Sequence, residues 1–364
     1  MRMDSSEVTY INRINGVIGS IEKRGIEAFL ISNEKNIRYL TGFWGKDSKS
    51  LLLLCRGHKI LFTDFRFIEQ ANRQKTVDVS QWWEPRIRCF VEKVTGIGLK
   101  NIAFEDCLPY FDFGKLSDSL SGIGLIPAHG VVEELRKIKD GFELDRIRTA
   151  AGIADAVFQS FLELLKPGIS ELDMATEMDY RIKKMGADDS AFDIVVASGM
   201  NSSMPHAALT KKRIEDFDIV MMDYGVVVDG YCSDITRTVI MGKANKKVID
   251  IYETVKEAQE LSLGSISEGI SCRKLDSVAR SYIEEKGYVE NFGHGLGHGV
   301  GLDIHEDPVV NPSSGQMLEK GMVFTVEPGI YIPGFGGVRI EDLVALKQDG
   351  VEVLTKTDKN LIII

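Results

Sequence analysis

The spacing of apolar residues predicts two kinds of structure along the chain. In roughly the first 130 residues, short apolar runs alternate with stretches of helical spacing, a pattern typical of an α/β domain. Helices are predicted over 10–24 and around 67–73. Strands are predicted at 28–32, 50–55, 59–64 and 102–105.

A charged segment interrupts this pattern between Val131 and Asp140. We place a domain boundary there, which predicts an N-terminal domain of residues 1–136 and a second domain of residues 137–364. The other interpretation of the segment is a solvated helix face.

Longer helices follow. The residues from 142 to 166 carry one apolar stripe at helical spacing, which Pro167-Gly168 ends. Ser170 is a candidate N-cap for the next helix. Further helices are predicted at 171–186, 246–262 and 271–287, and further strands at 192–197 and 351–354.

The composition limits the partners and the cellular compartment that we expect for this protein. A formal net charge of −10 over 364 residues argues against nucleic acid or an anionic membrane as the main partner. The five cysteines form no CxxC motif, as is typical of reduced thiols in a cytosolic protein. No signal peptide is recognisable at the N-terminus, and no apolar run reaches the roughly 18 residues that a membrane span needs. We therefore expect a cytoplasmic protein.

Three of the six histidines lie between Gly293 and Pro308, interleaved with glycines. A lone histidine would more often be a solvated loop residue. Three together indicate chemistry, because imidazole is the commonest metal ligand and the usual acid or base near neutral pH.

Two hairpins carry pairs of acids. Asp223 and Asp234 flank an Asp-Gly turn, and Glu327 and Glu341 flank a turn at Gly334. We expect each pair to face across its hairpin, where like charges repel, and the apolar flanks suggest burial. Four carboxylates and an imidazole suit two cations. The other interpretation is two acidic hairpins exposed to solvent.

The segment from His294 to Glu306 resembles the signature of the prolidase and aminopeptidase P group of the pita-bread metallopeptidases. The N-terminal third is similar to the creatinase-type domain of Xaa-Pro peptidases. This resemblance implies an α/β N-terminal domain followed by an α+β pita-bread catalytic domain. It also implies a homodimer that hydrolyses short proline-containing peptides.

The resemblance assigns two divalent metal ions, manganese first, with cobalt or zinc as alternatives. Asp223 would hold one ion, and His298 with Glu327 would hold the other. Asp234 and Glu341 would bridge the two ions. Glu327 would also act as the catalytic base.

The same resemblance places His206, His294 and His305 beside the substrate, with support of the carboxylates as the alternative. We favour the direct role for His305 and leave the other two open. Arg339 lies two residues before Glu341 and so shares its strand face. It would balance Asp223 or orient Glu341.

The exact activity has several interpretations. A dipeptidase needs a partner for the free carboxylate after proline, and Val309 follows the His305–Pro308 segment where some prolidases have arginine. We therefore favour an Xaa-Pro aminopeptidase over a dipeptidase, although Arg38 or Arg66 could supply the partner. The large N-terminal domain speaks against a methionine aminopeptidase. The filled ligand positions speak against a metal-free or non-catalytic relative.

Overall fold

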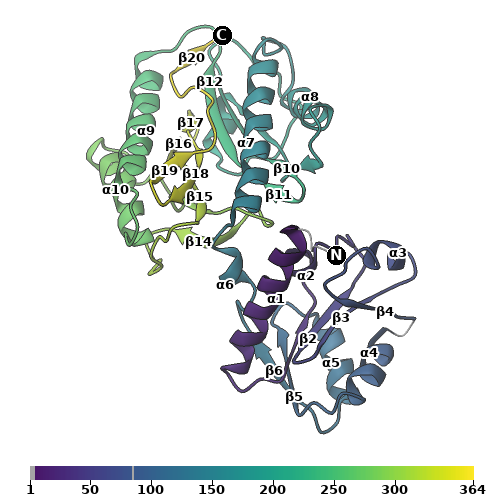
Figure 1. Cartoon of the computed structure of the whole chain (residues 1–364). Coiled ribbons are helices and arrows are strands. Elements are labelled where there is room, and N and C mark those ends of the chain that lie inside the picture. Colours follow the sequence, from purple (N-terminus) through teal and green to yellow (C-terminus); the bar gives the residue numbers. More distant parts are fainter. Residues whose placement is uncertain (1–4, 84–85) are drawn as a thin grey trace. The chain divides into compact units, whose positions relative to one another are not determined.

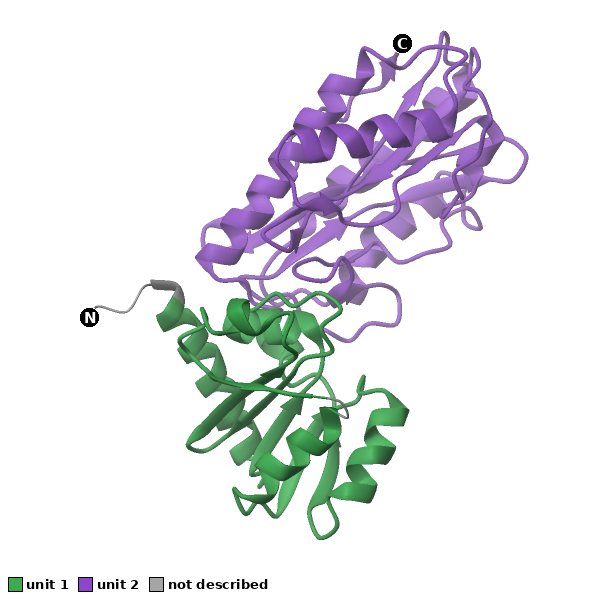
Figure 2. Ribbon diagram, turned by 90° about the vertical axis from the view of Figure 1, so that its right-hand side faces the viewer, with its two compact units in different colours: residues 1–136 green, residues 137–364 purple. Residues whose placement is uncertain are grey.

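The computed structural model describes residues 5–83 and 86–364, and the chain forms two compact units, residues 1–136 and 137–364 (Figure 2). Each unit has its own hydrophobic core. None of the described helices is long and apolar enough to cross a membrane. All five cysteines have free thiols.

Unit 1 is a six-stranded mixed sheet with the strand order β4-β3-β2-β1-β5-β6. Its strands are β1 Ala28–Ile31, β2 Leu51–Cys55, β3 His58–Thr63, β4 Asp78–Gln81, β5 Asn101–Glu105 and β6 Gly124–Ala128. Its helices are α1 Ser5–Glu22, α2 Glu34–Thr41, α3 Ile68–Ala71, α4 Arg86–Thr95, α5 Tyr110–Ser119 and α6 Glu133–Arg136. The four predicted strands are all present, and β1 pairs antiparallel with β2 and parallel with β5, so this unit is an α/β domain.

Four long helices lie in unit 2: α7 Gly141–Leu162, α8 Glu171–Lys184, α9 Lys246–Ser265 and α10 Cys272–Glu285. Each begins at a side-chain cap, as the polar residue before its apolar stripe dictates. The predicted cap Ser170 accepts a hydrogen bond from the Asp173 amide (3.0 Å). Asp140 caps α7 and exchanges hydrogen bonds with Glu143 in a capping box.

The strands of unit 2 form several sheets, with a 3₁₀ turn at Gly199–Ser203. The two largest have the orders β20-β12-β9-β8 and β14-β13-β15-β18-β19. A third is β11-β10-β7, and β16 pairs with β17. The strands are β7 Asp189–Ser190, β8 Val195–Ser198, β9 Ile219–Tyr224, β10 Val226–Val228, β11 Tyr231–Cys232, β12 Ile235–Ile240, β13 Gly297–Gly299, β14 Glu306–Val310, β15 Val323–Val326, β16 Gly329–Ile332, β17 Gly336–Arg339, β18 Asp342–Lys347, β19 Gly350–Val353 and β20 Ile362–Ile363.

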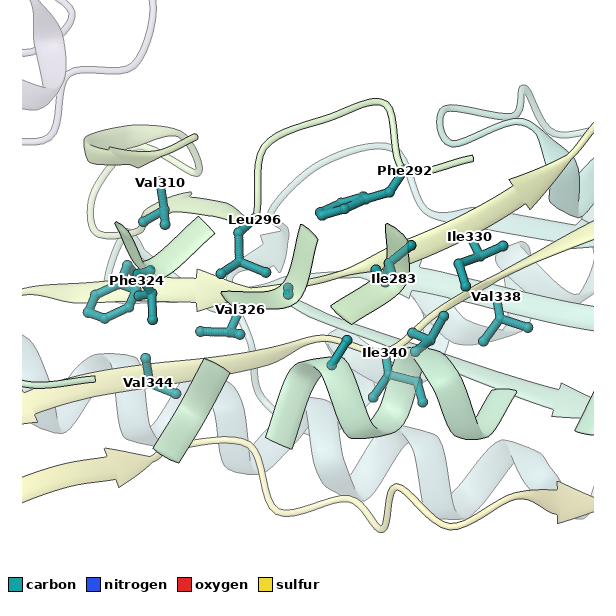
Figure 3. Packing of buried hydrophobic residues seen from close by; sticks show 14 of the residues in the cluster. Ile283, Phe292, Leu296, Val310, Phe324, Val326, Ile330, Val338, Ile340 and Val344 are labelled. Carbon is teal, nitrogen blue, oxygen red and sulfur yellow. The ribbon is translucent and has the colours of Figure 1, made fainter. Parts of the chain in front are cut away.

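Two buried clusters attach the helices to these sheets. One joins α7 and α8 to β8, β9 and β12. The other joins α9 and α10, which run side by side in Figure 1, to β15–β18. Figure 3 shows part of the second cluster, in which Phe292 and Leu296 belong to the same core as Val326 and Ile330. The segment with the histidines is thus anchored by apolar contacts on both sides of His294.

Candidate metal centre and catalytic cavity

The two acidic hairpins differ in register. Asp229 and Gly230 both have positive φ (47° and 76°), so the turn pairs Val228 with Tyr231. This register places Asp223 opposite Thr236, not opposite Asp234. The prediction that the two aspartates directly oppose each other is therefore wrong, because the turn lies further along the chain than their midpoint. Since Asp234 is two residues before Thr236, the carboxylates are diagonal neighbours instead.

The second hairpin has the expected register. β15 pairs with β18 up to Val326 and Asp342, and β16 pairs with β17 from Gly329 and Arg339. Both ladders follow one register, in which Glu327 is opposite Glu341. The amide of Glu341 also donates to the Thr236 carbonyl (3.1 Å), which joins this hairpin to β12. The two acidic hairpins therefore meet edge to edge.

His298 lies on β13 and points at the carboxylates of both hairpins. Its Nε2 is 3.5 Å from Asp234 Oδ2 and 3.4 Å from Glu327 Oε1. Its Nδ1 is 3.1 Å from the Gly299 carbonyl, which can only accept, so Nδ1 carries a hydrogen. Burial lowers the pKa of His298, and the neutral ring then presents a lone pair to two acids. A ring that donates Nδ1–H to a carbonyl and leaves Nε2 facing carboxylates has the tautomer of a metal-ligating histidine.

The strand that carries His298 has no room for other side chains beside it. A Cβ atom on Gly297 would lie 2.0 Å from the Thr325 carbonyl oxygen. A Cβ atom on Gly299 would lie 2.1 Å from the Asp307 carbonyl oxygen. The glycines on either side of His298 therefore serve the close approach of neighbouring backbones.

Two carboxylate oxygens at this point have no hydrogen-bond donor among the described residues: Asp234 Oδ1 and Glu341 Oε1, both buried. Burial, together with the neighbouring carboxylates, raises the pKa of Asp234 and of Glu341 well above the usual range. Ligand atoms of Asp234, His298 and Glu341 all lie within 4.8 Å of one another. Buried acids without donors, beside a neutral imidazole, fit a divalent cation.

Glu327 and Asp223 complete the acidic set. Burial raises the pKa of Glu327 to about 7, although Thr325 Oγ1 donates to it (3.0 Å). Asp223 pairs with Arg339, whose Nη2 is 2.5 Å from Asp223 Oδ2. Arg339 Nε also donates to Thr236 Oγ1 (3.0 Å), and that hydroxyl donates to Glu341 Oε2 (2.7 Å). Arg339 therefore pairs with Asp223 directly and reaches Glu341 through Thr236.

The three other candidate histidines divide into two kinds. His294 is engaged at both ring nitrogens, at 2.8 Å from the Gly295 carbonyl and 3.0 Å from the Tyr331 hydroxyl. Burial lowers its pKa to about 4. His206 and His305 are exposed, and their rings have no hydrogen bond within the described residues. The His305 ring lies 4.2 Å, centroid to centroid, from that of His298.

A cavity of about 490 Å³ brings the predicted site together. Its lining includes every candidate from the sequence: His206, Asp223, Asp234, His294, His298, His305, Glu327, Arg339 and Glu341. It also includes Val309 and residues that the sequence analysis did not select, such as Phe192 and Asn311. Among these lining residues the only Arg or Lys is Arg339, which Asp223 engages.

One further residue of the site, Tyr331, was not predicted from the sequence. The Tyr331 hydroxyl lies within hydrogen-bond distance of His294 Nε2. It also accepts a hydrogen bond from Arg339 Nη1 (2.8 Å). Its position four residues after Glu327 was the only available signal. Arg38 and Arg66, the two candidates for binding the free carboxylate of a dipeptide, both lie in unit 1. There Arg66 pairs with Asp64 (2.7 Å), and Arg38 lies over the Trp44 ring.

Comparison with known proteins identifies the family of this chain. Residues 145–348 match the model of metallopeptidase family M24, and residues 13–138 match the creatinase/prolidase N-terminal domain. The chain is 36% identical over 350 residues to the Xaa-Pro dipeptidase of Pyrococcus horikoshii, covering 96% of this chain and 98% of that protein.

Solved structures are similar over nearly the whole length. The Xaa-Pro dipeptidase from Bacillus anthracis is 40% identical, with a TM-score of 0.94 and coverage of 98% of this chain and 100% of that one. The X-Pro aminopeptidase from Thermotoga maritima is 35% identical, with a TM-score of 0.90 and coverage of 96% and 99%. The chain therefore belongs to metallopeptidase family M24, as a pita-bread hydrolase with a creatinase-type N-terminal domain.

Proposed function

We propose that this enzyme is an Xaa-Pro dipeptidase that uses two divalent metal ions. One observation carries the metal part of the proposal. Asp234 and Glu341 each have a buried oxygen without a hydrogen-bond donor among the described residues, and both acids lie beside His298 at the cavity. The names of the relatives support the substrate class, since two of the three above are Xaa-Pro dipeptidases. They favour the dipeptidase over the aminopeptidase that Val309 suggested.

The metal ligands we propose are Asp223 for one ion, His298 and Glu327 for the other, and Asp234 and Glu341 for both. Oxygen-rich donors without a thiolate suit manganese, with cobalt or zinc as alternatives. When bound, two such ions acidify a water molecule and neutralise charge that develops on the scissile carbonyl.

The side chains around these ligands have separate tasks in the proposal. Glu327 is the proposed catalytic base, because a carboxylate at this place could accept the proton of the attacking water. The rings of His206 and His305, without hydrogen bonds to the described residues, can donate to the substrate carbonyl or the leaving nitrogen. His294, engaged on both sides, supports Tyr331 and Arg339 rather than the substrate.

A second candidate is an Xaa-Pro aminopeptidase, which one observation favours. A groove of about 810 Å³ adjoins the cavity and shares Phe192, Asp193, Val195 and His206 with it. This groove offers room for more chain than a dipeptide has. The absence of a free Arg or Lys among the described cavity residues points the same way.

Steady-state hydrolysis with manganese separates the two functions. The substrates are Ala-Pro, Ala-Pro-Ala and, as a control, Ala-Ala. The dipeptidase proposal predicts a higher kcat/KM for Ala-Pro than for Ala-Pro-Ala. Equal or higher values for the tripeptide would favour the aminopeptidase. Cleavage of neither proline peptide would contradict both.

We also propose that the enzyme works as a homodimer in the cytoplasm. The resemblance to Xaa-Pro peptidases supports the dimer, and the five free cysteines support a reducing compartment. Sedimentation equilibrium tests the first statement, and cell fractionation tests the second.

A further inference from the structure

A buried ion pair lies outside the proposed ligands and histidines. Lys139 Nζ is 2.6 Å from Glu306 Oε1, and the two side chains are 1% and 9% exposed. The same ammonium lies 3.4 Å from the Lys137 carbonyl. Burying two charges costs desolvation energy that their attraction often only balances, so such a pair is weak evidence for a purely stabilising role.

Glu306 occupies a position between two histidines. It directly follows His305, and in the β13–β14 ladder it pairs with Gly299, the neighbour of His298. Lys139 comes from a distant part of the sequence, just before α7. Its amide donates to the Gly321 carbonyl (2.8 Å), which holds that segment in place. Residues 301–305 form the loop that carries His305. The ion pair therefore connects the end of this loop to a hydrogen-bonded segment of unit 2.

The carboxylate of Glu306 also fills the inside of that loop. A Cβ atom on Gly301 would lie 2.3 Å from Glu306 Oε1, so the carboxylate takes the space that a side chain would need. Gly301 is fixed in turn, because its carbonyl accepts from the Cys232 amide (2.8 Å) and its amide donates to the Asp303 carbonyl (2.9 Å). The loop folds around the charged end of Glu306.

His305 depends on this loop for its position. The ring is exposed and makes no hydrogen bond within the described residues, so its backbone must hold it near His298. We infer that Lys139 and Glu306 are positioning residues for His305. The pair sets the loop so that the imidazole faces the catalytic cavity. This inference rests on the proposed function, in which His305 acts on the substrate.

The test removes both charges together, because removal of one charge would leave the opposite charge buried and unbalanced. The variant is Lys139→Met/Glu306→Gln, which keeps the approximate size of both side chains. The matched control is Arg148→Met/Glu352→Gln, an ion pair of 2.7 Å in the same unit that lines neither the cavity nor the groove. Metal content and thermal melting check that each variant is folded and loaded.

We expect kcat for Ala-Pro to fall about tenfold or more in Lys139→Met/Glu306→Gln, since a misplacement of about 1 Å can cost two orders of magnitude. The KM and the metal content of this variant should change little. The kcat of the control variant should also stay close to that of the wild type. In a His305→Ala background, the same double substitution should leave kcat nearly unchanged, because the pair acts through His305. A purely structural pair would instead lower kcat by the same factor in both backgrounds.

Hydrogen exchange supplies a readout that does not depend on activity. Amides from 301 to 305 should exchange faster in Lys139→Met/Glu306→Gln than in the wild type, and the rest of the unit should not change. Equal exchange in this loop, or full additivity with His305→Ala, would overturn the inference. A wild-type enzyme that cleaves no Xaa-Pro peptide would contradict the proposed function instead, and the exchange experiment would still decide the inference.

Discussion

Arg339 Nη2 lies 2.5 Å from Asp223 Oδ2, and the guanidinium is buried beside the catalytic cavity. The same side chain contacts Thr236 and Tyr331. Through these neighbours it reaches Glu341 and His294. One guanidinium therefore sets the orientation of a proposed ligand, a proposed bridging acid and a histidine.

Substitution of Arg339 should reduce activity without abolishing the fold. Removal of such an outer partner typically costs about 10- to 100-fold in metal affinity or activity. We expect a loss in this range for Arg339→Gln. Arg339→Lys should not restore the activity, because one ammonium cannot contact Asp223, Thr236 and Tyr331 together. Metal titration and kcat/KM measure the effect, and a fully active Arg339→Lys enzyme would contradict it.

The proposed bridging acids make a stronger prediction. Asp234→Asn and Glu341→Gln should each lose both metal ions, because each side chain is expected to contact both. Elemental analysis of the purified variants measures this, with Glu352→Gln as a control acid outside the cavity. Two tightly bound ions in either variant would disprove the bridging role.

Metal removal should make stability depend on pH. Burial raises the folded-state pKa of Asp234, Glu341 and Glu327, the last to about 7. In the unfolded chain the pKa of such carboxyl groups is about 4. The protonated acids therefore favour the fold. This contribution is complete below about pH 4 and is lost as pH rises through the folded values.

The chelated protein should accordingly melt at a lower temperature at about pH 8 than at about pH 5.5, within the window that the raised pKa values define. Added manganese should restore the melting temperature at the higher pH, because the ions stabilise the ionised acids. Thermal melting at several pH values, with and without metal, measures both effects. A chelated protein that becomes more stable across this window would contradict the prediction.

The two exposed histidines should separate metal binding from turnover. We expect His206→Ala and His305→Ala each to keep two metal ions and to lose about 100-fold or more in kcat, the size of a typical acid–base contribution. Paired measurements of metal content and rate decide this. If metal is lost in proportion to rate, these residues support the ligands instead.

Local patterns were enough to predict much of the fold. The four long helices of unit 2 carry continuous apolar stripes and side-chain caps, so their periods and starts are visible in the sequence. Short elements were missed. α2, α4 and α5 have eight to ten residues each, and their formation depends on packing against the sheet of unit 1. The helix predicted around 67–73 is only the single turn of α3.

The acids of the two hairpins and the clustered histidines were selected from residue type and spacing, whereas the ligand roles and the choice of His206 came from the resemblance to Xaa-Pro peptidases. The first hairpin was misjudged by register, since the positive φ of Asp229 and Gly230 shifts the pairing. Contacts between distant segments left no local signal. Thr236 meets Glu341, and Lys139 meets Glu306, only because the fold joins segments more than 100 residues apart.

The tight packing around Gly297 and Gly299 limits how this enzyme can be redesigned. Any side chain at either position would push β13 away from its neighbours and carry His298 with it. An engineer who wants a different substrate should therefore vary the loops that carry His206 and His305, together with the groove residues near Phe192. A library that randomises the two glycines would consist mainly of proteins in which the imidazole no longer reaches the carboxylates.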